Sequence, residues 1–333
     1  MTFKVQRKEQ IEKRYFIKWA ILIIVLLIGS LFSIFVGVSE LSPSHLFQTE
    51  SIEWKVLVTT RVPRTISIVI AGATLSLSGL LMQQLTQNKF TSPSTVGTMQ
   101  SARLGLILSL LFFPKASIFN RALFSFGFAI IGTFIFLGLL RVIRANHSIL
   151  VPIVGIMLGN IISSLGTYFS LQWDIVQSVN AWLQGSFSLI HSANYQLIFV
   201  SLLSMLGMII GAHYFSIVGL GENIAIQLGA AYERILLIGI LFISLGTAVV
   251  LLTVGNIPFI GLVVPNLISL HKGDYFRRNI MDVTVYGAVF LLISDILARV
   301  IIYPYEIPVS VIVGIIGSAL FIYLLLKGEW HDK

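Results

Sequence analysis

Two arginines three positions apart could recognise a partner that carries carboxylates. The stretch TTRVPRT (59–65) places Arg61 and Arg64 on one face of the helix that Pro63 helps to begin. Arg299 lies near the end of a later apolar segment. Because a guanidinium group pairs with a carboxylate through two parallel hydrogen bonds, the three could receive acidic side chains of another protein. The alternative is that each anchors a helix end at a membrane surface.

No catalytic or metal-binding pattern accompanies these arginines in the sequence. His45, His191 and His213 are scattered, with no HExxH spacing and no nucleophile placed beside a base, so we expect no catalytic residue and no bound metal. Cysteine is absent, which excludes thiolate metal sites and disulfides. The sequence has no GxxxxGK[ST] loop, so any ATP-Mg has to be used by another chain.

Few ionisable side chains fall inside the apolar segments. Asp295 is the main acidic exception, and it stands four residues before Arg299, where the two can form an i,i+4 ion pair. The sequence therefore gives little support to ion-coupled secondary transport, because such transport usually needs several acidic groups at membrane depth. Arg103 also lies inside an apolar segment, and the sequence indicates no partner for it.

The apolar segments do contain small and uncharged polar residues. A run of small residues (71–79) precedes two glutamines, and the Gly155–Gly159 spacing permits close helix packing. Interhelical hydrogen bonding alone could explain the polar residues, but together they could line an uncharged translocation pathway. The candidate pathway residues are Gln83, Gln84, Asn88, Asn160 and Asn266.

The stretch GLGENIAIQLGAAYERI (219–235) predicts a short helix between two apolar segments. Glu222 follows Gly221, where an acidic residue complements the helix dipole, and Gly229 ends the one or two turns that follow. An ATPase subunit could bind a short helix that is exposed on the cytoplasmic face.

Composition places all these residues in a membrane protein. Of 333 residues, 56% are hydrophobic and only 11% are charged, and the mean hydropathy is +0.93. A soluble domain carries about twice that charge. We expect an all-α polytopic protein with a single transmembrane domain over 1–333. Its predicted helices lie near 17–37, 63–85, 96–113, 120–140, 149–170, 195–217, 234–254, 257–271, 279–302 and 308–327. The eighth contains two prolines and should be irregular.

The lysines and arginines indicate how the chain is oriented. If the number of spans is even, the basic N-terminus (1–16) and the tail lie on the same side of the membrane. Most of the lysines and arginines in the loops lie on that side too. That side should be the cytoplasm, which then also receives the segment 219–234. Loop charges of this kind explain the net charge of +8 better than nucleic-acid binding does. Arg61, Arg64 and Arg299 would face outward, against this trend.

Taken together, the segments resemble the permease subunits of the iron-siderophore and vitamin B12 family of ABC importers, the FecCD family. The resemblance covers most of the chain after the first span, and its motifs follow in the family's order. They are RVPR (61–64), SGLLMQQLTQNKFTSPSTVG (78–97), GENIAIQLG (221–229), GNIPFIGLVVPN (255–266), DILAR (295–299) and PYEIPVS (304–310). Three features depart from the common pattern of the family: NKFTSP, Asn266 and Arg103. In these features the chain is most similar to the branch that carries catecholate or petrobactin-type ferric siderophores.

The resemblance implies a type II ABC importer permease fold of ten helices in a bacterial cell membrane, with both termini cytoplasmic. It implies a second permease, two cytoplasmic ATPase subunits that use ATP-Mg, and an extracytoplasmic binding protein that delivers a ferric siderophore. It assigns Arg61, Arg64 and Arg299 to docking of the binding protein, and Gly221, Glu222 and Gly229 to ATPase coupling. Haem or a corrinoid is the alternative cargo.

Overall fold

The computed structural model describes residues 20–37, 51–143, 150–192 and 195–326. The predicted basic N-terminus (1–16), the tail and His45 lie outside this part. Within it every regular element is helical. An apolar helix, Ala20–Phe35, comes first. The labelled elements are α2 (Ile52–Val56), η1 (Leu57–Arg61), α3 (Val62–Thr86), α4 (Thr98–Phe112), α5 (Ile118–Ile143), α6 (Leu150–Gln172), α7 (Val176–Leu183), η2 (Tyr195–Phe199), α8 (Val200–Ile210), α9 (Ala212–Val218), α10 (Glu222–Gln227), α11 (Tyr232–Val254), α12 (Ile260–Lys272), α13 (Phe276–Val300) and α14 (Val309–Leu326).

Each of the ten predicted spans corresponds to helix in the structure. By length and hydropathy, six described helices can cross a membrane alone, and a seventh span arises if the bent pair Tyr195–Ile210 and Ala212–Val218 counts as one. Three of the remaining predicted spans are shorter helices: Ala20–Phe35, α4 and α12. The all-helical membrane fold is confirmed, whereas the lengths are less uniform than the hydropathy pattern predicts.

The sixth predicted span is not one straight helix. Its two parts, η2 with α8 and then α9, meet at an angle of 64°. The break falls at Gly211, where an added Cβ would lie 2.5 Å from the ring of Phe215. The expectation of a single helix over 195–217 is therefore wrong, because hydropathy reports that a segment is apolar and not that it is straight.

The second predicted span begins earlier than expected. The helix runs without interruption from Ile52 to Thr86 and includes a π-helical turn, η1, just before Pro63. Proline has no backbone N–H to donate to the preceding turn, and a wider turn accommodates it without ending the helix. Arg61 and Arg64 consequently lie within a continuous helix and not at its first turn.

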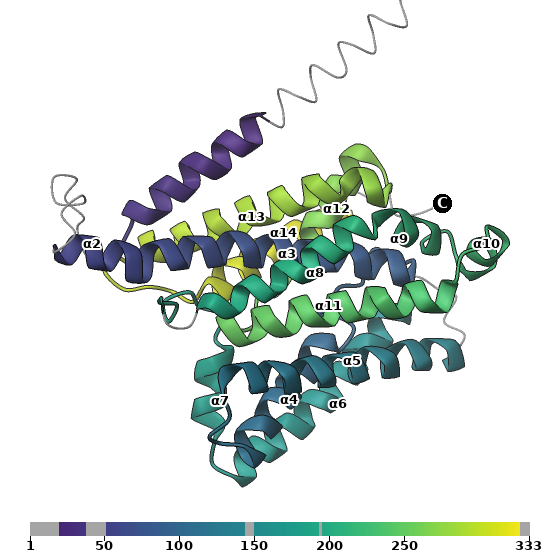
Figure 1. Ribbon diagram of the computed structural model, residues 1–333, viewed down its shortest axis with the longest axis horizontal. Coiled ribbons are helices and arrows are strands. Elements are labelled where there is room, and N and C mark those ends of the chain that lie inside the picture. Colours follow the sequence, from purple (N-terminus) through teal and green to yellow (C-terminus); the bar gives the residue numbers. More distant parts are fainter. Residues whose placement is uncertain (1–19, 38–50, 144–149, 193–194, 327–333) are drawn as a thin grey trace, which may run out of the picture.

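The helix α3 forms the centre of the bundle and packs against α13, α11, α12 and α8 (Figure 1). Its apolar window is 89% buried, whereas the windows of α5, α6 and α14 are 28% buried. Small residues make the central position possible. An added Cβ on Gly79 would lie 1.8 Å from the carbonyl oxygen of Gly261, and one on Gly72 would lie 2.5 Å from that of Gly287. The α2 and α10 ends lie at opposite extremes of the bundle (Figure 1).

Candidate functional site

Arg64 is buried at the α2 end of the bundle and holds two carboxylates. Its Nη2 lies 2.8 Å from Oδ1 of Asp295, on α13. Its Nη1 lies 2.9 Å from Oε2 of Glu306, in the segment between α13 and α14. The side chain therefore ties the central helix α3 to two segments that follow it by more than two hundred residues in the chain.

Arg299 completes this cluster from the other side of Asp295. Its Nη2 lies 2.6 Å from Oδ2 of Asp295, which confirms the i,i+4 pair predicted from the sequence. Its Nη1 donates to the carbonyl oxygens of Ser33 and Val36, at 2.8 and 2.7 Å. These bonds attach the end of the first helix to α13.

The four side chains form a charge-balanced network, which we call the Asp295 ion-pair cluster: Arg64, Asp295, Arg299 and Glu306. Asp295 is fully buried and Arg299 is 3% exposed. Charges removed from water are tolerated only where each finds a close partner, because desolvation costs several kcal/mol per ion, in order of magnitude. The two arginines and two acids satisfy that requirement within one chain.

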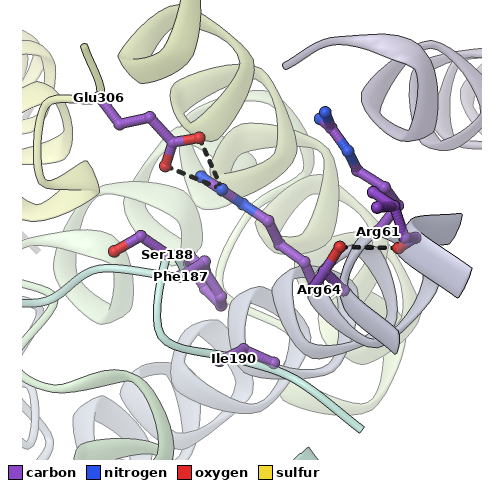
Figure 2. A pocket seen from close by; sticks show the side chains of 8 residues that line it. Arg61, Arg64, Phe187, Ser188, Ile190 and Glu306 are labelled. Atoms are coloured by element: carbon purple, nitrogen blue, oxygen red, sulfur yellow. Dashed lines mark hydrogen bonds and ion pairs between the residues drawn. The ribbon is translucent and has the colours of Figure 1, made fainter. Parts of the chain in front are cut away.

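Arg61 lies beside the cluster but points elsewhere. Its Nη1 donates to the carbonyl oxygen of Val36, and it lines a hollow of about 370 Å³ together with Arg64, Glu306 and the segment Phe187–Ile190. Figure 2 shows Arg64 reaching to Glu306 while the guanidinium group of Arg61 turns away from both. Just after this segment, the amide of Ser192 donates to the carbonyl oxygen of Thr59, in η1, at 2.8 Å.

The structure thus gathers the three predicted docking arginines at one end of the bundle. It also places Arg64 and Arg299 in internal ion pairs, with little of either side chain exposed. Their role in docking stays a prediction. Glu306 was missed as a member of the cluster, and its only signal in the sequence is its place in the PYEIP stretch.

The predicted short helix of the coupling segment is present as α10. Gly221 and Gly229 flank it with φ of +103° and +78°, values that favour glycine over other residues. Ala225 is buried, whereas Ile224, Ile226 and Leu228 are exposed. The segment also contacts the end of α3, since Nε2 of Gln87 donates to the carbonyl oxygen of Gly219 at 3.3 Å.

The candidate pathway residues do not meet at one surface of the chain. Gln83 and Asn266 are buried, and Nδ2 of Asn266 donates to the carbonyl oxygen of Lys89 at 2.9 Å, which holds α12 to the α3–α4 turn. In that turn Oδ1 of Asn88 accepts from the amide of Phe90. Asn160 is exposed on α6.

The side chain of Gln84 lies beside Gly219. Contacts with the turn therefore engage Oδ1 of Asn88 and Nδ2 of Asn266, whereas the buried Oδ1 of Asn266 has no hydrogen-bond partner among the described residues. A pathway role for any of the five stays a prediction.

The described residues contain no group of three or more His, Asp or Glu side chains that could hold a metal ion. The arginines and acids of the Asp295 ion-pair cluster are ionisable groups that do lie together. Such an arrangement can hold segments together and present charge, but it offers no nucleophile beside a base.

The sequence and the fold both match known transport proteins. The model of the FecCD transport family matches residues 24–327. A petrobactin import system permease protein of Bacillus subtilis is 45% identical, over 92% of this chain and 97% of its own length. A ferric-anguibactin transport system permease of Vibrio anguillarum is 32% identical, over 89% and 94%. A vitamin B12 import system permease of Yersinia enterocolitica is 30% identical, over 97% and 95%.

A solved structure supports the same fold. An inward-facing metal-chelate type ABC transporter superposes with a TM-score of 0.74 over 92% of this chain and 97% of that one, at 24% identity. The likeness at this identity concerns the fold, and the family model and the relatives supply the assignment. The chain belongs to the FecCD transport family.

Proposed function

We propose that this chain is the transmembrane permease subunit of an ATP-driven importer that moves a ferric siderophore, of catecholate type, into the cytoplasm. The 45% identity to a petrobactin permease over nearly the whole of both chains carries the proposal. The ferric-anguibactin permease supports it. The vitamin B12 permease is the more distant of the three, so a corrinoid is the less favoured cargo.

In this proposal the chain works with a second permease, two cytoplasmic ATPase subunits and an extracytoplasmic binding protein. The basic termini and the α10 end face the cytoplasm, and the Asp295 ion-pair cluster faces the binding protein on the outer side. The α2 and α10 ends lie at opposite extremes of the bundle, as delivery on one side and ATP use on the other would require (Figure 1).

The exposed apolar side chains of α10 favour this segment as the contact for an ATPase subunit. Ile226 is 56% exposed and Leu228 is 61% exposed, although both lie in or beside a short helix held in place by buried Ala225. Apolar side chains of this kind gain free energy when a partner covers them. Movement of α10 would then reach the centre of the bundle through Gln87 and α3.

Replacing both Ile224 and Ile226 by glutamate should detach the ATPase subunits. Burying two unpaired carboxylates at an apolar contact costs several kcal/mol, in order of magnitude, whereas the exposed positions leave the permease fold intact. The measurement is the amount of ATPase that copurifies with the permease in detergent. The control is Asn120→Glu, a change at an exposed position near the start of α5. Normal copurification of the double variant would remove α10 from the contact.

Docking at the outer end can be tested without breaking the cluster. In the variant Arg61→Gln, the four side chains of the cluster keep their charges and partners, whereas the hollow loses one positive charge. We expect at least about tenfold weaker docking of the loaded binding protein, as for a charge pair worth roughly 1.4 kcal/mol, and thermal unfolding is recorded alongside to show that the cluster is intact. Surface plasmon resonance on the reconstituted transporter measures the affinity. Unchanged docking at unchanged stability would rule out a landing site at this hollow.

Transport itself is tested with the chain reconstituted in proteoliposomes with its permease and ATPase partners. Binding proteins loaded with catecholate siderophores, other siderophores, haem or a corrinoid are added in turn, and ATP hydrolysis is recorded with uptake of the cargo. Stimulation by a ferric catecholate complex is the expected result. Stimulation by a corrinoid alone, from a complex that is otherwise active, would replace the siderophore by the alternative cargo.

A further inference from the structure

A second hollow, of about 490 Å³, lies between α4, α6, α7 and the segment that leads into α12. Its lining is partly polar and partly apolar and, among the described residues, includes no aspartate or glutamate. The polar groups that matter here are Gln100, Arg103, Ser163, Asn180, Gln184 and Asn256. We call it the Arg103 hollow.

Among the described residues, Arg103 is the only charged one that lines this hollow, and none of them neutralises its charge. It makes no ion pair there, and its buried Nε has no hydrogen-bond partner. Arg64 and Arg299, by contrast, each have a carboxylate within 3 Å. An uncompensated charge inside a membrane-spanning segment is costly, and such residues are generally retained for function.

Gln100 contributes a second buried polar atom that lacks a hydrogen-bond partner among the described residues of this hollow. It lies three residues before Arg103, on the same face of α4, and its Nε2 donates to the carbonyl oxygen of Ser94 at 3.0 Å. Its buried Oε1 has no partner among the described residues. The side-chain amides and the hydroxyl group of the lining add neutral donors around one cation, which is the donor set that an anionic oxygen requires.

We infer that the Arg103 hollow is a transient binding subsite, occupied during transport, for the negatively charged oxygens of the iron complex. The inference rests on the proposed function. A ferric complex of three catecholates is anionic because the ligand charges exceed the charge of Fe³⁺. One arginine with neutral donors attracts such a complex, and the absence of acids from the lining avoids repulsion. Because the cation is single, the attraction stays weak enough for the complex to move on.

The electrostatic claim can be tested on the full-length chain in membrane vesicles, because the chain has no cysteine. Ser163→Cys places one thiol in the hollow, and Ser117→Cys places one on the surface outside it. Each is treated with an anionic or a cationic methanethiosulfonate of similar size, in the presence of Arg103, Arg103→Lys or Arg103→Gln. The quantity measured is the ratio of the two reaction rates.

We expect the anionic reagent to be favoured at position 163. Arg103→Gln should lower the anion-to-cation ratio by roughly five- to tenfold, as for a charge about 7 Å away in a medium close to water, and Arg103→Lys should restore most of it. The ratio at position 117 should not change. An equal ratio with arginine and glutamine, or failure of either reagent to reach position 163, would overturn the inference.

The transit role is tested in the reconstituted importer with saturating loaded binding protein. Arg103→Gln should reduce uptake per ATP hydrolysed by roughly fivefold or more, because the anionic complex loses its attraction to one positive charge, while Arg103→Lys keeps most of it. Arg277→Gln removes an exposed arginine at the start of α13 and should have no effect. Unchanged uptake in Arg103→Gln would overturn the transit role.

The two tests keep this inference separate from the proposed function. If wild-type importer moves no ferric siderophore, the proposed function fails and the transit role fails with it. If wild type is active but the labelling ratio does not depend on Arg103, only the subsite fails.

Discussion

Asp295→Asn is expected to destabilise the protein by about 3–5 kcal/mol, the usual cost of removing one partner from a buried ion pair. The carboxylate lies within 2.8 Å of Arg64 and 2.6 Å of Arg299, and it is fully buried. The asparagine has nearly the same shape, so the loss is one of charge and not of packing. Thermal unfolding of the purified protein in detergent, with the amount of folded protein recovered from membranes, measures the effect.

Asp274→Asn is the matched control for this change. Asp274 pairs with Lys89 at 2.7 Å, but the two side chains are 58% and 42% exposed. An exposed pair contributes about 0–1 kcal/mol, so the control should unfold close to wild type. Glu306→Gln should fall between the two, because Glu306 is partly exposed. Equal stability of Asp295→Asn and Asp274→Asn would mean that the Asp295 ion-pair cluster does not stabilise the fold.

Gly79→Ala should have the second largest effect, a loss of about 3 kcal/mol, at the upper end of the usual cost of overpacking. Its new Cβ would lie 1.8 Å from the carbonyl oxygen of Gly261, which belongs to the backbone of α12 and cannot rotate away. The helices α3 and α12 would have to separate, and the bundle would loosen at its centre. The measurement is the same unfolding transition.

Gly127→Ala, on α5, serves as its control. An added Cβ at this position meets no atom within 4 Å. Alanine also favours helix over glycine by about 1 kcal/mol, so this variant should be as stable as wild type or more stable. If Gly79→Ala behaves in the same way, the close approach of α3 and α12 is not needed for the fold.

Local features of the sequence predicted much of what the structure shows. Helical segments follow from runs of apolar residues, and all ten predicted spans correspond to helix. The Asp295–Arg299 pair could be predicted because its partners are four residues apart on one helix. The α10 helix could be predicted because glycines flank it on both sides. The glycine spacing of α6 predicted close packing, and Gly155 does pack against Thr95.

Partners far apart in the chain could not be predicted. Arg64 and Glu306 are 242 residues apart, and no helical period relates them. The charge pattern of the sequence predicts three outward-facing arginines, whereas the structure neutralises Arg64 and Arg299 with acids of the same chain. The candidate pathway residues could likewise be selected only by residue type, because their neighbours in space are distant in the chain. The turn contacts of Asn88 and Asn266 appear only in the folded chain.

The order of the amino acids is enough to identify a polytopic helical membrane protein, to locate its helices and, through the resemblance carried by its motifs, to indicate its family. These properties depend on hydropathy, charge distribution and short-range spacing. The folded chain, by contrast, is needed to show which arginines are neutralised. It also shows that α3 is central, that the helix over 195–217 is bent, and that Arg103 faces an acid-free hollow. Those features depend on which surfaces of distant helices approach closely, because burial and charge pairing are set by neighbours in space and not by neighbours in the chain.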